Sequence, residues 1–207
     1  EEHNIDWYKN QAKLWKAELK KNPKNENGWL YYYTACRMVW VLNGWKDSDR
    51  AEINEILKTI AQKIPDTFIY NYINAYDIGS MKPEESYSFL NKAYEIQPDN
   101  VMLFDKLVSR FEIKQNLEKR KEINTKWFQS GTYSTGILNY NYNVLSSLAP
   151  NAILFTFGDN DTYPVLMIQD ALNYRTDVVC INTSLAKIGA YRNEIFKKLA
   201  IVLSEPE

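Results

Sequence analysis

Histidine and cysteine are scarce in this sequence of 207 residues. The only histidine is His3, so a Ser-His-Asp triad, a Cys-His dyad and a zinc site with histidine ligands are not expected. The two cysteines, Cys36 and Cys180, lie in apolar segments, and we expect both to be small buried side chains. A disulfide between them would require an oxidising compartment, and no other sequence feature demands it.

Long apolar runs and an excess of one charge are also absent. No stretch approaches the roughly 20 apolar residues that cross a bilayer, so we expect a soluble chain that does not span a membrane. The net charge is −1 and no stripe of lysine and arginine occurs, which disfavours nucleic acid as a partner. The sequence starts with Glu1 rather than Met, and we therefore expect a processed or trimmed chain.

The first two thirds of the chain carry a repeat. Three helical segments each end near a proline, namely Pro23, Pro65 or Pro98, and 33 residues separate Pro65 from Pro98 and Pro98 from Gly131. This period is typical of stacked helix pairs. We therefore predict a mainly α protein in which residues 1–130 form a tetratricopeptide-like array of helix pairs.

Large apolar side chains take fixed positions in this repeat. Phe104, Leu107 and Phe111 follow Pro98 at helical spacing, and we expect them to be buried together. The first unit is longer than 33 residues, which predicts an insertion in the loop at residues 43–47. The aromatic segment WLYYY starts at Trp29. Consecutive helical residues point in different directions, so some of these rings pack in the core and others are exposed, where they could also stack on sugars or peptides.

Residues 131–207 have a different pattern, which predicts a connecting helix and a small β-α-β-α unit. The run ILFTF is typical of a buried parallel strand, and two strands joined by a helix lie parallel. A two-stranded sheet is small, so its edges need cover from the helices, a partner chain or sequence beyond Glu207. The predicted elements are a helix at 132–148, a strand at 153–157, a helix starting at 161 or 162, a strand at 178–182 and a helix at 190–203.

Acidic and amide side chains crowd the motif GDNDTYP, which follows the first of these strands. The carboxyl end of a parallel strand is where ligands bind in α/β units, and two carboxylates one residue apart repel each other unless a cation or donors stabilise them. Oxygen ligands of this kind suit Mg²⁺, Mn²⁺ or Ca²⁺, with Asp159 and Asp161 as the candidate metal ligands. The candidate ligand-binding residues are Asp159, Asn160, Asp161, Thr162, Tyr163, Asn182 and Ser184.

The same motif has a structural interpretation. Asp161 or Thr162 would cap the amino terminus of the following helix, and Pro164 would occupy the first turn of that helix. Asp159 would then accept backbone N–H groups. Both interpretations stay open at this point, and no cofactor other than a divalent cation is expected.

Residues 141–185 resemble the soluble region of a large family of predicted Bacteroidetes membrane glycosyltransferases, which are related in outline to O-mannosyltransferases. The likeness is carried by AP-NAILFT, GDNDTYP, RTDVV and the trio Asn182, Ser184 and Leu185. This chain has Phe157 where the family commonly has Asn. The transfer chemistry of the family is expected in its membrane domain, which this sequence lacks. The resemblance therefore implies a periplasmic or other extracytoplasmic envelope location, without glycosyltransferase activity.

Three functions fit these patterns. The favoured one is a non-catalytic envelope module that binds a protein or peptide on the surface that helix pairs leave free, with homo-oligomers also compatible. The alternative is a carbohydrate- or nucleotide-sugar-binding component of a glycosylation pathway, with a divalent cation at the GDNDTYP loop and a glycan as partner. The third, a metal-dependent phosphotransferase, is disfavoured by Tyr163 and by the absence of a later acidic pair. We assign no catalytic residue.

Overall fold

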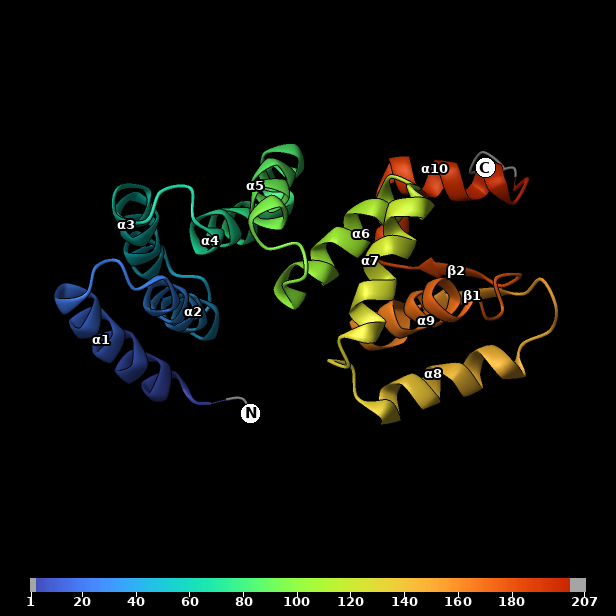
Figure 1. Ribbon diagram of the computed structural model, residues 1–207, viewed down its shortest axis with the longest axis horizontal. Helices are drawn as coiled ribbons and strands as arrows, with labels where there is room; N and C mark the ends of the chain where they lie inside the picture. The colour runs from blue at the N-terminus through green and yellow to red at the C-terminus, as the bar shows by residue number, and fades with distance from the viewer. Residues whose placement is uncertain (1–2, 202–207) are drawn as a thin grey trace. The chain divides into compact units, whose positions relative to one another are not determined.

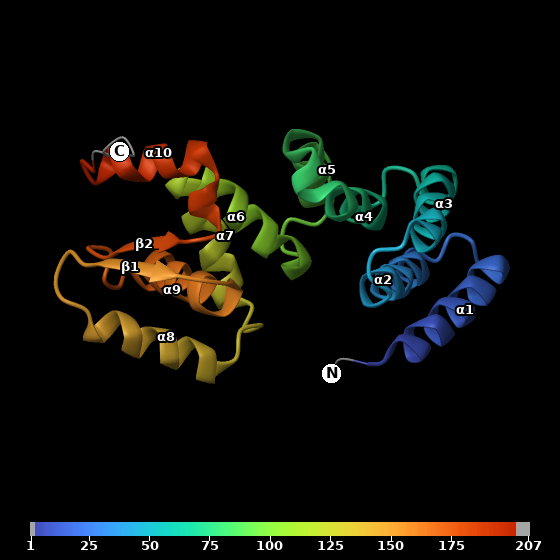
Figure 2. The ribbon, with the colours of Figure 1, turned by 180° about the vertical axis from the view of Figure 1, so that it is seen from behind.

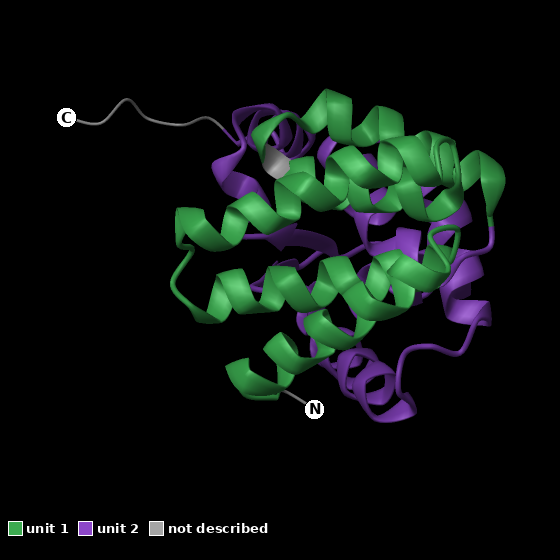
Figure 3. Ribbon diagram, turned by 90° about the vertical axis from the view of Figure 1, so that its left-hand side faces the viewer, with its two compact units in different colours: residues 1–98 green, residues 99–207 purple. Residues whose placement is uncertain are grey.

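The computed structural model describes residues 3–201, apart from the side chain of Ser80. In this part of the chain, ten α-helices surround two short strands, so the protein is mainly helical and ends in a small unit with parallel strands, as predicted (Figure 1). The chain divides into two compact units, residues 1–98 and 99–207, which Figure 3 shows in different colours. The prediction from sequence placed the division at residue 130 instead.

Each unit has its own set of elements. The first unit contains α1 (Ile5–Lys21), α2 (Glu26–Leu42), α3 (Asp47–Lys63), α4 (Phe68–Ile78) and α5 (Pro83–Ile96). The second unit contains α6 (Phe104–Ile113), α7 (Leu117–Gln129), α8 (Thr135–Ser147), β1 (Ile153–Thr156), α9 (Asp159–Leu172), β2 (Val179–Asn182) and α10 (Gly189–Lys198). The helix predicted to end at residue 203 ends at Lys198, and its last predicted residues lie outside the described part.

The period of 33 residues corresponds to pairs of consecutive helices that pack on each other: α2 with α3, α4 with α5 and α6 with α7. Pro65 and Pro98 lie in the connections between these pairs. The first unit of the repeat is longer because α2 and α3 have 17 residues each, whereas α4 has 11 and α5 has 14. The predicted insertion at 43–47 is therefore wrong, since Asp47 already belongs to α3.

Buried aromatic and charged side chains hold the first unit together. Of the aromatic segment of α2, Trp29 and Tyr33 are buried and Tyr31 is 49% exposed, so the predicted division between core and surface is confirmed. The Tyr33 hydroxyl donates to Asp77 on α4 at 3.1 Å, and Arg50 on α3 donates to both oxygens of Asp77 at 2.6 Å. This network joins three helices, and burial together with Asp77 raises the pKa of Tyr33.

The core of the second unit contains the predicted cluster. Phe104 and Leu107 are each 1% exposed and Phe111 is 8% exposed, as the repeat register requires. Trp127 on α7 packs edge-on against Phe104, with 6.4 Å between ring centroids. The prediction that these side chains are buried together is confirmed.

The two strands are parallel and adjacent, with Thr156 opposite Asn182 at their carboxyl ends. They lie between α9 on one face and α10 on the other (Figures 1 and 2). Side chains alternate along a strand, so Thr156 points to the α9 face, where it bonds Thr162. Ile181 points to the α10 face and is buried there with Tyr191.

The strand β1 is half exposed, and the prediction that it is fully buried is wrong. Ile153 is 40% exposed, Phe155 is 65% exposed and Phe157, just past the strand, is 76% exposed. The reason is that α10 packs over β2 on this face and leaves β1 uncovered. An unbroken apolar run therefore marked a strand with an open apolar face.

Candidate functional site

The GDNDTYP motif lies at the carboxyl end of β1, and Asn182 and Ser184 lie at the same end of β2. The chain turns into α9 through Gly158, which is the N-cap residue and has a φ of 104°, a conformation that favours glycine. All seven candidate residues therefore come from two neighbouring strand ends. Their side chains have different environments.

The helix α9 begins earlier than predicted, and this changes the role of the motif. Its first residue is Asp159, so Asp161 and Thr162 are not N-caps and Pro164 lies inside the helix. A proline inside a helix has no N–H group for the carbonyl four residues earlier, here that of Asn160. The side chain of Asn141 on α8 supplies the missing donor, with Nδ2 at 3.0 Å from the Asn160 oxygen. The proline therefore creates an acceptor that ties α9 to α8.

A buried network of three polar side chains crosses the sheet and α9. The hydroxyls of Thr156 and Thr162 are 2.8 Å apart, and Asn182 Nδ2 donates to the Thr162 hydroxyl at 2.8 Å. The other end of the Asn182 amide accepts the N–H groups of Ser184 and Leu185, both at 2.9 Å. Thr162 and Asn182 thus fix the two strand ends and the turn after β2, and both are buried.

The two carboxylates of the motif differ. Asp161 Oδ2 accepts the backbone N–H of Phe157 at 2.6 Å, so this carboxylate reaches back to the residue before the N-cap. Its other oxygen, Oδ1, is buried and has no hydrogen-bond partner among the described residues. Asp159 is exposed. In the described part of the chain, no group of three or more His, Cys, Asp and Glu side chains is placed to hold a metal ion.

Tyr163 faces away from the other candidates. Its hydroxyl is 2.7 Å from the Ser109 hydroxyl on α6, and its ring lies 5.4 Å from that of Trp127. Burial raises the pKa of Tyr163. This residue therefore joins α9 to α6 and α7, and it is not part of an open site.

An open hollow of about 460 Å³ remains beside the motif. Its aromatic walls are Tyr140, which is 65% exposed, and Phe157. Its polar wall is formed by Asp159, Asn160 and Asp161. The hollow combines flat apolar rings with carboxylate and amide groups, which is the chemistry that holds the face and the hydroxyls of a sugar.

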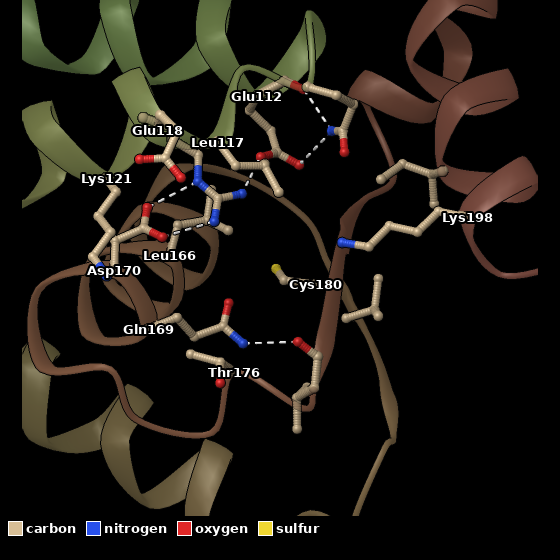
Figure 4. A pocket seen from close by; sticks show the side chains of 15 residues that line it. Glu112, Leu117, Glu118, Lys121, Leu166, Gln169, Asp170, Thr176, Cys180 and Lys198 are labelled. Carbon is tan, nitrogen blue, oxygen red and sulfur yellow. Dashed lines mark hydrogen bonds and ion pairs between the residues drawn. The ribbon is translucent and has the colours of Figure 1, made fainter.

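A second cavity, of about 220 Å³, lies between α6, α7, α9, β2 and α10 (Figure 4). Arg120 crosses one wall and donates to both oxygens of Asp170 at 2.8 Å and to Glu112. Asn124 donates to Asp170 at 2.7 Å. No sequence pattern indicated this cluster, since its members are far apart along the chain and lie in ordinary helices.

The thiol of Cys180 also lines this cavity (Figure 4). Burial raises its pKa to about 12, so it is a thiol rather than a reactive thiolate at neutral pH. Both cysteines are free and buried, which agrees with the packing role expected from the sequence. The cavity therefore offers no activated thiol, and its buried charged groups are already paired with each other.

The first unit has an apolar groove between α1, α2 and α3, of about 220 Å³. Leu19, Trp29, Tyr32 and Ile56 line its floor and Pro23 lies at one end. Its charged lining residues are Lys16, Lys20, Glu52, Glu55 and Lys63, and Lys16 is paired with Glu52 at 2.7 Å. Its lining thus combines large apolar side chains with lysines, among which Lys20 and Lys63 take part in no ion pair that the described residues form.

Arg175, from the RTDVV motif, closes the carboxyl end of α8. Its guanidinium donates to the carbonyl oxygens of Leu145, Leu148 and Ala149 at 2.6 to 2.9 Å. It also pairs with Asp177, which accepts the Asn151 N–H at 2.9 Å. The hydrogen bonds from Arg175 and Asn151 lower the pKa of Asp177. A helix end and the entry to β1 are thereby fixed by one motif.

Residues 137–200 match the family model TMEM260-associated domain 2. This segment is about a third of the chain and covers most of α8 together with β1, α9, β2 and α10. The hollow and the Arg175 contacts therefore lie within the matched region. No curated protein and no solved structure matches the chain. No tetratricopeptide model matches the helix pairs.

No helix in residues 3–201 is both long and apolar enough to cross a membrane.

Proposed function

We propose that the protein is a non-catalytic module of the cell envelope that binds a protein or peptide segment in the groove between α1, α2 and α3. The observation that carries this proposal is the lining of the groove, where Trp29, Tyr32 and Ile56 meet three lysines. Aromatic side chains in a desolvated groove are the usual anchors of a binding interface. The envelope location rests on the family match of residues 137–200 and on the motif resemblance.

The chemistry of the groove suggests the chemistry of the segment. An aliphatic or aromatic side chain would fill the apolar floor, and carboxylates beside it would pair with Lys20 and Lys63. We therefore expect an acidic segment with one apolar anchor. The two carboxylates that line the groove, Glu52 and Glu55, are each paired with a lysine, which is consistent with binding rather than catalysis.

The test uses labelled peptides with one Leu, Phe or Trp flanked by glutamates, and a second set flanked by lysines. We expect the acidic set to bind and K20E to weaken binding about tenfold, which corresponds to about 1.4 kcal/mol. The matched control is K21E, because Lys21 is the next residue of α1 and does not line the groove. Equal binding of both peptide sets, or equal weakening by K20E and K21E, would contradict the proposal.

The hollow beside GDNDTYP supports a second candidate function, the binding of a carbohydrate or nucleotide sugar with a divalent cation. Its specific support is the unpartnered Asp161 Oδ1 between exposed Tyr140 and Phe157. A cation held by Asp159 and Asp161 would raise the free energy of unfolding by about 2.7 kcal/mol at a hundredfold excess over its Kd.

This second function is tested by thermal unfolding with Mg²⁺, Mn²⁺ or Ca²⁺ at millimolar concentration, alone and with a nucleoside diphosphate sugar. Binding predicts a stabilising shift that Asp159→Asn removes and that Tyr140→Ala reduces for the sugar alone. Tyr142→Ala is the control on the same helix, because Tyr142 stacks on Tyr174 and does not line the hollow. The absence of any shift in the wild type would leave Asp161 with its structural role only.

A further inference from the structure

The strand β1 has an open edge that is limited to two residues. The N–H groups of Val179 and Thr183 donate to the carbonyl oxygens of Ala152 and Thr156, so these residues of β1 turn toward β2. Backbone groups alternate along a strand, and those of Ile153 and Phe155 therefore turn to the opposite edge. No described residue forms a hydrogen bond with them there.

The positions on either side of this window are closed by carboxylates. The N–H of Asn151 donates to Asp177 Oδ2 at 2.9 Å, and the N–H of Phe157 donates to Asp161 Oδ2 at 2.6 Å. Only Ile153 and Phe155 therefore keep a donor and an acceptor for another strand.

This edge has none of the devices that normally prevent strand pairing. Edge strands usually carry a lysine, a proline or a bulge. Residues 152–157 are Ala, Ile, Leu, Phe, Thr and Phe, without a charge. The side chains of Ile153, Phe155 and Phe157 form an apolar stripe on the uncovered face. The other strand, β2, has no comparable open surface, because Val179 and Ile181 are packed against residues of α6 and α10.

We propose that a second copy of this chain covers the β1 edge, through antiparallel pairing of the two β1 strands about a twofold axis at Leu154. Ile153 of each copy would exchange two hydrogen bonds with Phe155 of the second copy, which uses all four open groups on each side. The uncharged edge causes no repulsion between identical copies. A single open edge closes as a dimer instead of a filament, because the pairing is isologous.

The pairing also completes the sheet. Two strands become four, which is the usual size of a stable sheet, and the two apolar stripes become continuous. Ile153 would lie opposite Phe155 of the second copy on the uncovered face, an aliphatic and aromatic pair that stabilises antiparallel strands. The interface would be small, so we expect a dissociation constant of about micromolar order.

Sedimentation equilibrium of the whole chain between about 1 and 100 µM, a range that brackets micromolar affinity, tests the proposal. We expect the mass to rise from 24.3 kDa toward that of a dimer. Phe155→Lys should weaken association at least tenfold, and Leu14→Lys, at another exposed apolar position, should not change it. Because Phe155 is mostly exposed, the circular dichroism spectrum of its variant should match that of the wild type.

Hydrogen exchange separates strand pairing from other association. The amides of Ile153 and Phe155 should become protected as the concentration rises, and the amide of Phe157 should not change. A monomer at every concentration would overturn the proposal and leave the edge to a different chain. Dimers without protection of Ile153 and Phe155, or dimers equally weakened by both lysine variants, would overturn it as well.

Discussion

Replacement of Asn141 tests the bond that Pro164 makes necessary. Asn141 is 1% exposed and donates to the Asn160 carbonyl, which has lost its helical donor to the proline. Asn141→Ala should therefore lower the free energy of unfolding by about 1–3 kcal/mol, the range for a buried acceptor that loses its donor. Asn141 also donates to Ile137, and this contribution must be separated from the one at α9.

A double-mutant cycle with Pro164→Ala makes this separation. Replacement of the proline by alanine would restore the N–H group that the helix offers to Asn160, so Asn141→Ala should cost less in that background. We expect a coupling of about 1 kcal/mol, within the 0.5–3 kcal/mol typical of residues that share a partner. The bond from Asn141 to Ile137 is present in both backgrounds and cancels.

The assay is hydrogen exchange in increasing urea, read from peptides of β1 and α9. This readout reports the second unit alone, which global unfolding of a chain with two compact units does not do. If the two substitutions were additive within about 0.3 kcal/mol, the role assigned to Asn141 would be refuted.

Three further predictions concern packing and charge. Leu107→Ala should cost about 2–5 kcal/mol in unfolding experiments, whereas Leu117→Ala, at a position 37% exposed, should cost under about 1 kcal/mol. Arg120→Met should cost about 3–5 kcal/mol because it leaves two buried carboxylates uncompensated, and Lys121→Met on the same helix should have little effect in the same assay. Asp177 has a lowered pKa in the folded state, so its stabilising effect is present above the unfolded pKa of about 3.9 and is lost as the pH falls below it. Acid titration of unfolding should therefore show that the difference between wild type and Asp177→Asn shrinks below about pH 4.

The helix pairs and the parallel strands could be predicted because local patterns encode them. Leu107 and its neighbours repeat at helical spacing, and the two apolar runs around α9 have the length of strands. The start of α9 could not be predicted in the same way. Asp161 and Pro164 form a normal helix-start pattern, and only the tertiary contact from Asn141 allows the proline to lie inside the helix.

The candidate site was harder to predict, because composition does not show where side chains point. The sequence brought Thr162 and Asn182 to one end of the sheet, but it did not indicate that they bond each other and are buried. Tyr163 belongs to the packing against α6 for the same reason. Neighbouring residues outside the motif, such as Tyr140, complete the hollow, and their contribution depends on how α8 packs against α9.

The ion pair between Arg120 and Asp170 decides where this chain can be cut. A fragment that starts at residue 131 would keep Asp170 and lose both Arg120 and Asn124, so a carboxylate would lie exposed on what had been the inner face of α9. Its apolar neighbours would lose the cover of α6 and α7 at the same time. The smallest piece able to fold by itself should therefore begin near Asp99, with two helices that the repeat pattern alone would assign to the preceding array.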